Sequence, residues 1–84
     1  KMSLEKQIRL LVKDYKKDYK NTTLVVLQSR ATTDVILLIE KNISVMEMRL
    51  DFNKSDSHRS YIIKMGLIRL KERKYKAIDY LLNI

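Results

Sequence analysis

Two helical patterns separated by a polar turn constrain this chain more than any other feature. Apolar residues lie at Ile36, Ile39, Ile43, Met46 and Leu50, alternating three and four residues apart. This spacing places them on one side of an α-helix and suits packing against an antiparallel helix. Polar residues follow at 53–58, and a second apolar and basic pattern then begins. The sequence therefore predicts two helices joined by a short turn, a helical hairpin.

Composition supports an all-α fold. The 84 residues contain no proline and a single glycine, Gly66. Architectures rich in β-hairpins need turn residues such as glycine and proline, and the scarcity of these residues therefore favours long helices. We expect three to four helices, with the N-terminal helix packed on the hairpin, in one domain that spans residues 1–84. A chain of this length buries only a modest core.

The first and second helices have candidate start signals. Ser3 is a plausible N-cap for a first helix that runs to Lys20, and Thr32 or Thr33 for the second. The apolar stripe of the first helix contains Leu4, Ile8, Leu11 and Tyr15, and the opposite side carries Lys6, Lys13, Lys17 and Lys20. Between the two helices, residues 21–31 are expected to form an irregular or short helical connector.

The third helix is expected to begin between Ser57 and Arg59. It either runs to the end of the chain or breaks near residues 72–74. Its predicted buried stripe contains Ile63, Leu67 and Leu70, and continues through Ala77, Ile78 and Leu81.

The inventory of reactive side chains is thin. There is no cysteine, and His58 is the only histidine, which excludes thiolate and two-histidine metal sites. The chain also lacks a glycine-rich phosphate loop. We therefore expect no enzyme activity, no cofactor and no small-molecule substrate. The longest apolar run, Val35 to Ile39, is five residues, so no membrane span is expected.

Charge favours a polyanionic partner. The formal net charge is +8, distributed as +4 over residues 1–20, −1 over 21–52 and +5 over 53–84. A nearly neutral central helix flanked by two basic helices suits nucleic acid, because phosphates neutralised by lysine and arginine release counterions. The competing interpretation is an ordinary solvated surface rich in lysine.

The turn has both a structural and a functional interpretation. Ser55, Asp56 or Ser57 is suited to cap the third helix. An acid among Lys54, His58 and Arg59 is also suited to accept a hydrogen bond from a guanine amino group or a 2′-hydroxyl in an RNA minor groove. In this hypothesis Asp56 reads the groove beside Ser57 or His58, while Lys54 and Arg59 contact phosphates.

A second candidate surface lies on the third helix. Arg69, Arg73, Lys76 and Tyr80 follow the spacing i, i+4, i+7 and i+11, so they share one side of the helix. The three cations are suited to phosphates and the tyrosine to stacking on an unpaired base. A solvated side with a half-buried tyrosine explains the same pattern.

These residues carry a family resemblance. The stretches IEKNISVMEMRLDFNKSD and HRSYIIKM resemble the second and third helices of the small-subunit ribosomal protein fifteen family, and Lys64 lies within the second stretch. ATTDVILLIEKNI and EKQIRLL are similar to the entry to helix two and to the first helix. AIDYLL is similar to the end of the third helix. In another alignment KYKAIDYLLNI matches the fourth helix, and Tyr75 replaces Tyr80 as the family counterpart.

The resemblance assigns roles to individual residues. It implies that Asp56 is the aspartate in the minor groove, with His58 beside it, and that Arg49 stands in a histidine position. Arg73 and Tyr80 would correspond to residues at an rRNA three-way junction. Thr22 and Thr23 would belong to the loop that touches this junction, although the family's glycine is absent there. Capping is the alternative role of these threonines.

The resemblance implies a structural component of the small ribosomal subunit. Its partners would be small-subunit rRNA, neighbouring ribosomal proteins and the large subunit at the interface. A mitochondrial ribosome is favoured over a plastid or cytoplasmic one, because the copy is divergent and rich in lysine and isoleucine.

Two other functions are compatible with the sequence. A small dimeric helical DNA-binding regulator would use residues 57–73 as a recognition or dimer helix. A protein-interaction or membrane-surface module would use the basic first helix.

Overall fold

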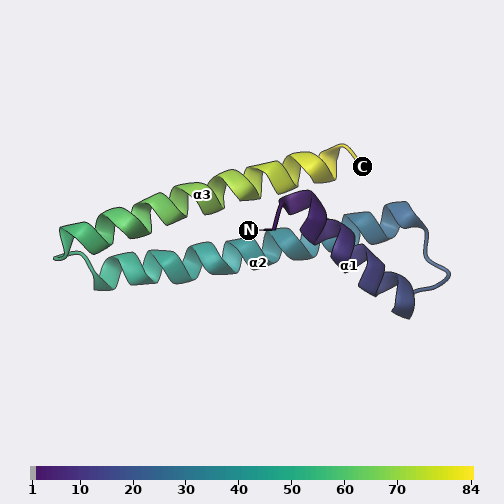
Figure 1. Cartoon of the computed structure of the whole chain (residues 1–84), viewed down its shortest axis with the longest axis horizontal. Helices are drawn as coiled ribbons and strands as arrows, with labels where there is room; N and C mark the ends of the chain where they lie inside the picture. The colour runs from purple at the N-terminus through teal and green to yellow at the C-terminus, as the bar shows by residue number, and fades with distance from the viewer. Residues whose placement is uncertain (1) are drawn as a thin grey trace.

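The computed structural model describes residues 2–84 as three helices: α1 (Leu4–Asp18), α2 (Leu24–Phe52) and α3 (Ser57–Leu82). Helices α2 and α3 form a long antiparallel hairpin, and α1 lies across α2 towards the end away from the hairpin turn (Figure 1). The extents of the molecule are 53 × 23 × 19 Å. The prediction of an all-α hairpin with the N-terminal helix packed on it is confirmed.

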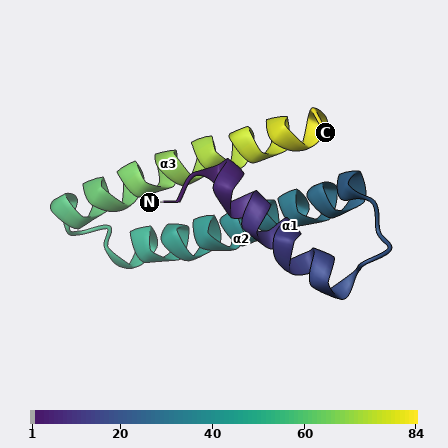
Figure 2. The ribbon, with the colours of Figure 1, turned by 45° about the vertical axis from the view of Figure 1, so that its right-hand side comes forward.

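The first helix forms as its sequence predicts. The Ser3 side chain accepts a hydrogen bond from the Lys6 backbone N–H, which is the predicted N-cap. Leu4 and Ile8 are buried, and Leu11 and Tyr15 pack against the core from partly buried positions. The helix ends at Asp18, two residues before the predicted end at Lys20. The 45° turn in Figure 2 shows α1 crossing α2, with its N-terminal end towards α3.

The second helix begins much earlier than predicted. Residues 24–31 are its first turns rather than a connector, so a start at Thr32 or Thr33 is wrong. Both threonines lie within the helix, where their hydroxyls donate to the carbonyls of Gln28 and Ser29. Tertiary packing explains the difference, because Leu27 and Ala31 are buried in the core.

The third helix is a single unbroken element. It begins at Ser57, within the predicted range, and continues to Leu82 without the alternative break near residues 72–74. Within its predicted stripe, Leu67 and Ala77 are buried and the other members are partly buried. An intact α3 matters for the site, because it keeps every basic residue from Arg59 to Lys76 on one rigid rod.

The core is concentrated where the three helices meet. Its buried side chains come mainly from α1 and the first half of α2, and are Leu4, Ile8, Val12, Leu27, Ala31, Val35, Ile39 and Ala77. The predicted seam of α2 faces α3, with Ile39 buried and the other four members partly buried. Towards the hairpin turn, the buried residues are Leu67 and Ser60, so this end has little core.

Two polar contacts fix α1 to the hairpin. The Tyr15 hydroxyl donates to Asp34 Oδ2 on α2 at 2.5 Å. That hydrogen bond, together with burial, raises the pKa of Tyr15 to about 12. The Arg73 guanidinium on α3 donates to Gln7 Oε1 on α1 at 2.7 Å.

Candidate nucleic-acid interface

The hairpin turn is held by backbone contacts around Asn53. Its carbonyl accepts hydrogen bonds from the Asp56 N–H at 3.1 Å and from the buried Ser60 hydroxyl at 2.7 Å. The Asn53 side chain in turn donates to the carbonyl of Arg49 at 2.7 Å and closes the last turn of α2. These contacts give the turn a defined shape and leave its basic side chains in solvent.

Asp56 caps α3, as one of the predicted alternatives states. Its Oδ1 accepts from the Arg59 N–H at 3.0 Å, and its Oδ2 lies 3.7 Å from Arg59 Nε. The carboxylate is about half exposed, and the arginine side chain is largely exposed. A carboxylate has about four lone-pair sites, so acceptor capacity remains after the cap is formed.

The other turn residues are exposed around Asp56. Lys54 Nζ lies 3.5 Å from Asp51 Oδ1 in an exposed ion pair, which is weak in water. Ser57 and His58 are the first two residues of α3 and are exposed at its N-terminal end. The partial positive charge of a helix N-terminus adds to the attraction for anions at this end of the molecule.

A row of residues spaced by seven connects the turn with α1. Arg59, Gly66, Arg73 and Tyr80 lie on one side of α3, because seven residues correspond to nearly two helical turns. Arg73 contacts α1 directly through Gln7, and Tyr80 packs against the core from a partly buried position. This row therefore marks the side of α3 that faces α1.

Three of the four predicted residues of the α3 basic surface line one groove. Arg69, Arg73 and Lys76 border a groove of about 670 Å³ between the two hairpin helices and the N-terminal residues 2–5. Glu5 and Glu72 line it as well, so the groove is not uniformly positive. Arg73 is partly buried and holds α1, so part of its role is structural.

Tyr80 lies in a second groove, most of whose members were not predicted as site residues. This groove, of about 250 Å³, is bordered by three cations of α1 and by polar and apolar residues of α2. Its members besides Tyr80 are Ile8, Arg9, Val12, Lys13, Lys16, Leu24 and Gln28. Arg9, Lys13 and Lys16 follow the spacing i, i+4 and i+7, the same signal that singled out the α3 cations.

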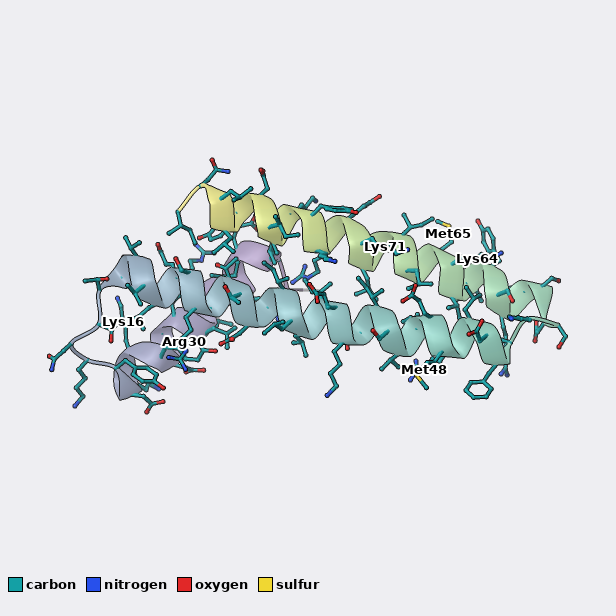
Figure 3. All side chains as sticks on the ribbon, turned by 180° about the vertical axis from the view of Figure 1, so that it is seen from behind. Lys16, Arg30, Met48, Lys64, Met65 and Lys71 are labelled. Carbon is teal, nitrogen blue, oxygen red and sulfur yellow. The ribbon has the colours of Figure 1, made fainter. Side chains whose placement is uncertain are left out.

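The remaining predicted residues lie apart from one another. Arg49 is exposed beside Met46, which lines the larger groove. Thr23 occupies the N-cap position of α2, but its side chain makes no capping hydrogen bond, so the predicted capping role is wrong for its hydroxyl. Thr22 lies in the preceding loop. Lys64 is exposed on the face away from α1 (Figure 3).

The predicted site therefore divides into two regions. Ser57 and Arg73 are separated by about 24 Å along α3, and Ser57 and Tyr80 by about 35 Å. The turn end holds Lys54, Asp56, His58 and Arg59, and the end near α1 holds the two grooves.

Comparisons with family models, curated proteins and solved structures found no match for this chain. No helix within residues 2–84 combines the length and apolar character that crossing a membrane requires. The same residues contain no group of three or more acidic or histidine side chains placed to hold a metal ion.

Proposed function

We propose that this protein is a non-catalytic RNA-binding component of the small ribosomal subunit that contacts structured rRNA at two separated regions. The observation that carries the proposal is the row of α3 residues on the α1 side. It joins the turn, where Asp56 and Arg59 lie, to the grooves that contain Arg73 and Tyr80. The family resemblance supports the same assignment, and the mitochondrial location remains part of the proposal.

At the turn, each residue would have a separate task. Lys54 and Arg59 would contact phosphates, which position the protein without reading sequence. Asp56 would accept a hydrogen bond from a guanine amino group or a 2′-hydroxyl in the shallow RNA minor groove. The capping bond to Arg59 N–H would hold its carboxylate in place for this contact.

Near α1, the two grooves would receive a second part of the RNA. Arg69, Arg73 and Lys76 would neutralise phosphates, and the partly buried Tyr80 would offer a ring for stacking. The rigid α3 sets the distance between the regions, so the preferred ligand would be an RNA whose minor groove and junction are similarly spaced. Neighbouring ribosomal proteins and the large subunit would be further partners.

The test compares two substitutions of Asp56 that differ in capping. Asp56→Ser keeps a capping oxygen but shortens the side chain, so it removes the carboxylate that would contact RNA. Asp56→Ala removes both the cap and the RNA contact. We expect Asp56→Ser to weaken binding to a transcript of the central domain of small-subunit rRNA by about 1–3 kcal/mol, with unfolding stability nearly unchanged. Affinity is measured by filter binding at several salt concentrations and stability by urea denaturation.

Lys41→Gln on α2 provides a matched control, because it removes an exposed charge outside the turn and both grooves. It should change affinity less than Arg59→Gln. An increase in affinity for Asp56→Ser would mean that this carboxylate only repels phosphate. Tight binding of duplex DNA by a dimer would favour the regulator instead. Absence of the tagged protein from the small-subunit fraction of a lysate would rule out the ribosomal assignment.

A further inference from the structure

A second row of residues spaced by seven lies exposed on α3. Tyr61, Ile68, Tyr75 and Leu82 are large apolar or aromatic residues, and their exposed fractions are 63%, 51%, 68% and 79%. Single exposed apolar residues are common on protein surfaces, but four of them spaced by seven form one line along the helix, as the d positions of a packed helix do. The row, hereafter the outer row, extends along about 31 Å of helix.

The outer row faces away from α1. Each member follows a residue of the α1-facing row by two positions, which corresponds to about 200° around the helix. In Figure 3, α1 lies behind the hairpin, and Lys64, Met65 and Lys71 are labelled along α3 on this side. The outer row therefore lies on a different side of α3 from the α1-facing row, although Arg69 and Lys76 beside it also line the larger groove.

Cations flank the outer row on both sides. If the outer row occupies the d positions of a heptad, the g positions include Lys64 and Lys71 together with Ile78, and the e positions include Arg69 and Lys76 together with Ile62. The four cations are exposed. Glu72 and Asp79 follow Ile68 and Tyr75 by four residues, at a positions within the contact stripe. In a docked helix, basic residues opposite these two carboxylates would pair with them.

This charge pattern argues against a second copy of the chain. In a parallel pair of α3 helices, g positions face e positions, so Lys64 and Lys71 would approach Arg69 and Lys76 of the other copy. In an antiparallel pair, g faces g and e faces e, so cations again face cations. Like charges at these positions disfavour a pairing, whereas acidic residues at the partner's flanks would form ion pairs.

We propose that the outer row docks an amphipathic helix of another protein, one with an apolar heptad stripe flanked by glutamate or aspartate. The apolar stripe would supply the buried contact, and Lys64 and Lys71 would select the acidic flanks. This proposal rests on the geometry and charge of α3 and does not depend on RNA binding.

The experiment uses the full chain and two synthetic helices of about four heptads. Both carry leucine along the stripe, with lysine at the positions opposite Glu72 and Asp79. One has glutamate on both flanks and the other has lysine. We expect fluorescence anisotropy to detect binding of the acidic-flank peptide only, and 0.5 M NaCl, about three times physiological ionic strength, to weaken it. Ile68→Asp should reduce affinity at least about tenfold, as loss of a central anchor does.

Met48→Asp is the matched control, because Met48 is an exposed apolar residue of α2 outside the outer row. It should leave peptide affinity within about twofold. Circular dichroism and thermal melts establish that both variants fold. The double variant Lys64→Glu, Lys71→Glu should abolish most of the preference for the acidic-flank peptide, because only Arg69 and Lys76 on the other flank would still favour it.

Four results would overturn the proposal. Equal binding of both peptides would show that the flanking charges do not select the partner. Equal peptide affinity of Ile68→Asp and the unsubstituted chain would show that the outer row is not the binding site. Sedimentation velocity that shows a dimer lost in Ile68→Asp would identify a second copy as the occupant. Loss of RNA affinity in the double lysine variant, with its peptide preference unchanged, would identify these lysines as an RNA surface instead.

Discussion

Asp56 shows how one side chain can serve the fold and remain available for a ligand. One carboxylate oxygen caps α3 through the Arg59 N–H, and the second lies near the same arginine in solvent. Substitution with alanine therefore confounds capping with recognition, which is why serine is the more informative change. Arg73 has a similar dual position, since its contact with Gln7 holds α1 while its side chain also lines a groove.

Because of the Tyr15–Asp34 hydrogen bond, the free energy of unfolding should decrease as the pH rises above 10. The hydrogen bond to Asp34, followed by burial, raises the pKa of Tyr15 from 10.0 to about 12 in the folded protein. Folding thus favours the neutral phenol. The contribution of this hydrogen bond to the free energy of unfolding is complete below pH 10 and is lost as the pH rises from 10 to 12. Tyr15→Phe should cost about 1–2 kcal/mol at neutral pH, with the difference from the unsubstituted protein narrowing above pH 10.

Urea denaturation between pH 7 and pH 11 measures this dependence. Tyr75→Phe is the control, because the Tyr75 ring is 68% exposed and the same loss of a hydroxyl should have little effect there. A constant difference between Tyr15→Phe and the unsubstituted protein across the whole range would contradict the assigned cause.

Among the elements, α2 departs most from its sequence prediction. Its first turns, residues 24–31, contain no glycine or proline, and Leu27 and Ala31 are buried beneath α1. Threonine at positions 32 and 33 resembles a helix start in sequence, but a helix already supported by packing continues through it. The loop that contains Thr22 and Thr23 consequently leads straight into α2, and Leu24 lines the same groove as Tyr80.

Gly66 gives a prediction for α3. It lies inside the helix, and an added Cβ would meet the terminal carbon of Met46 at 3.0 Å. Alanine improves helix propensity by about 1 kcal/mol, and the flexible thioether can shift at a smaller cost. We expect Gly66→Ala to stabilise the protein by about 0.5 kcal/mol and to raise Tm by about 2–4 °C in a thermal melt.

Gly66→Val tests the steric part of this explanation. Valine adds two more carbons at the same close contact and has a poorer helix propensity, so it should destabilise the protein relative to alanine. A lower Tm for alanine than for glycine would mean that the Met46 contact outweighs the propensity gain.

For the whole molecule, the position of α1 predicts an uneven distribution of stability. The buried core lies mainly where α1 covers the hairpin, and the turn end has Leu67 and Ser60 as its buried residues. Regions with few buried apolar contacts open at lower free energy. Amides of residues 44–50 and 59–65 should therefore exchange hydrogen faster than those of residues 29–39 and 70–78 in native-state exchange measurements.

Ile8→Ala provides the corresponding perturbation. It removes a fully buried side chain of α1 and should cost about 2–5 kcal/mol. The protection of the amides of residues 29–39 against hydrogen exchange should then fall towards that of the amides of residues 44–50 and 59–65. Uniform protection along the unsubstituted hairpin would mean that both ends unfold as one unit.

The sequence is enough to predict the helical class, the hairpin and the location of its turn, because these depend on local periodicity and on capping at Ser3 and Asp56. It also determined which cations share a side of α3, since spacing along one helix is enough for that. The start of α2 depends on tertiary structure, because Thr23 at its N-cap makes no capping hydrogen bond and burial of Leu27 and Ala31 in the core supports the first turns. Tertiary structure also placed Arg9, Lys13 and Lys16 beside Tyr80, and Arg73 against Gln7, since contacts between distant helices depend on how α1 crosses the hairpin.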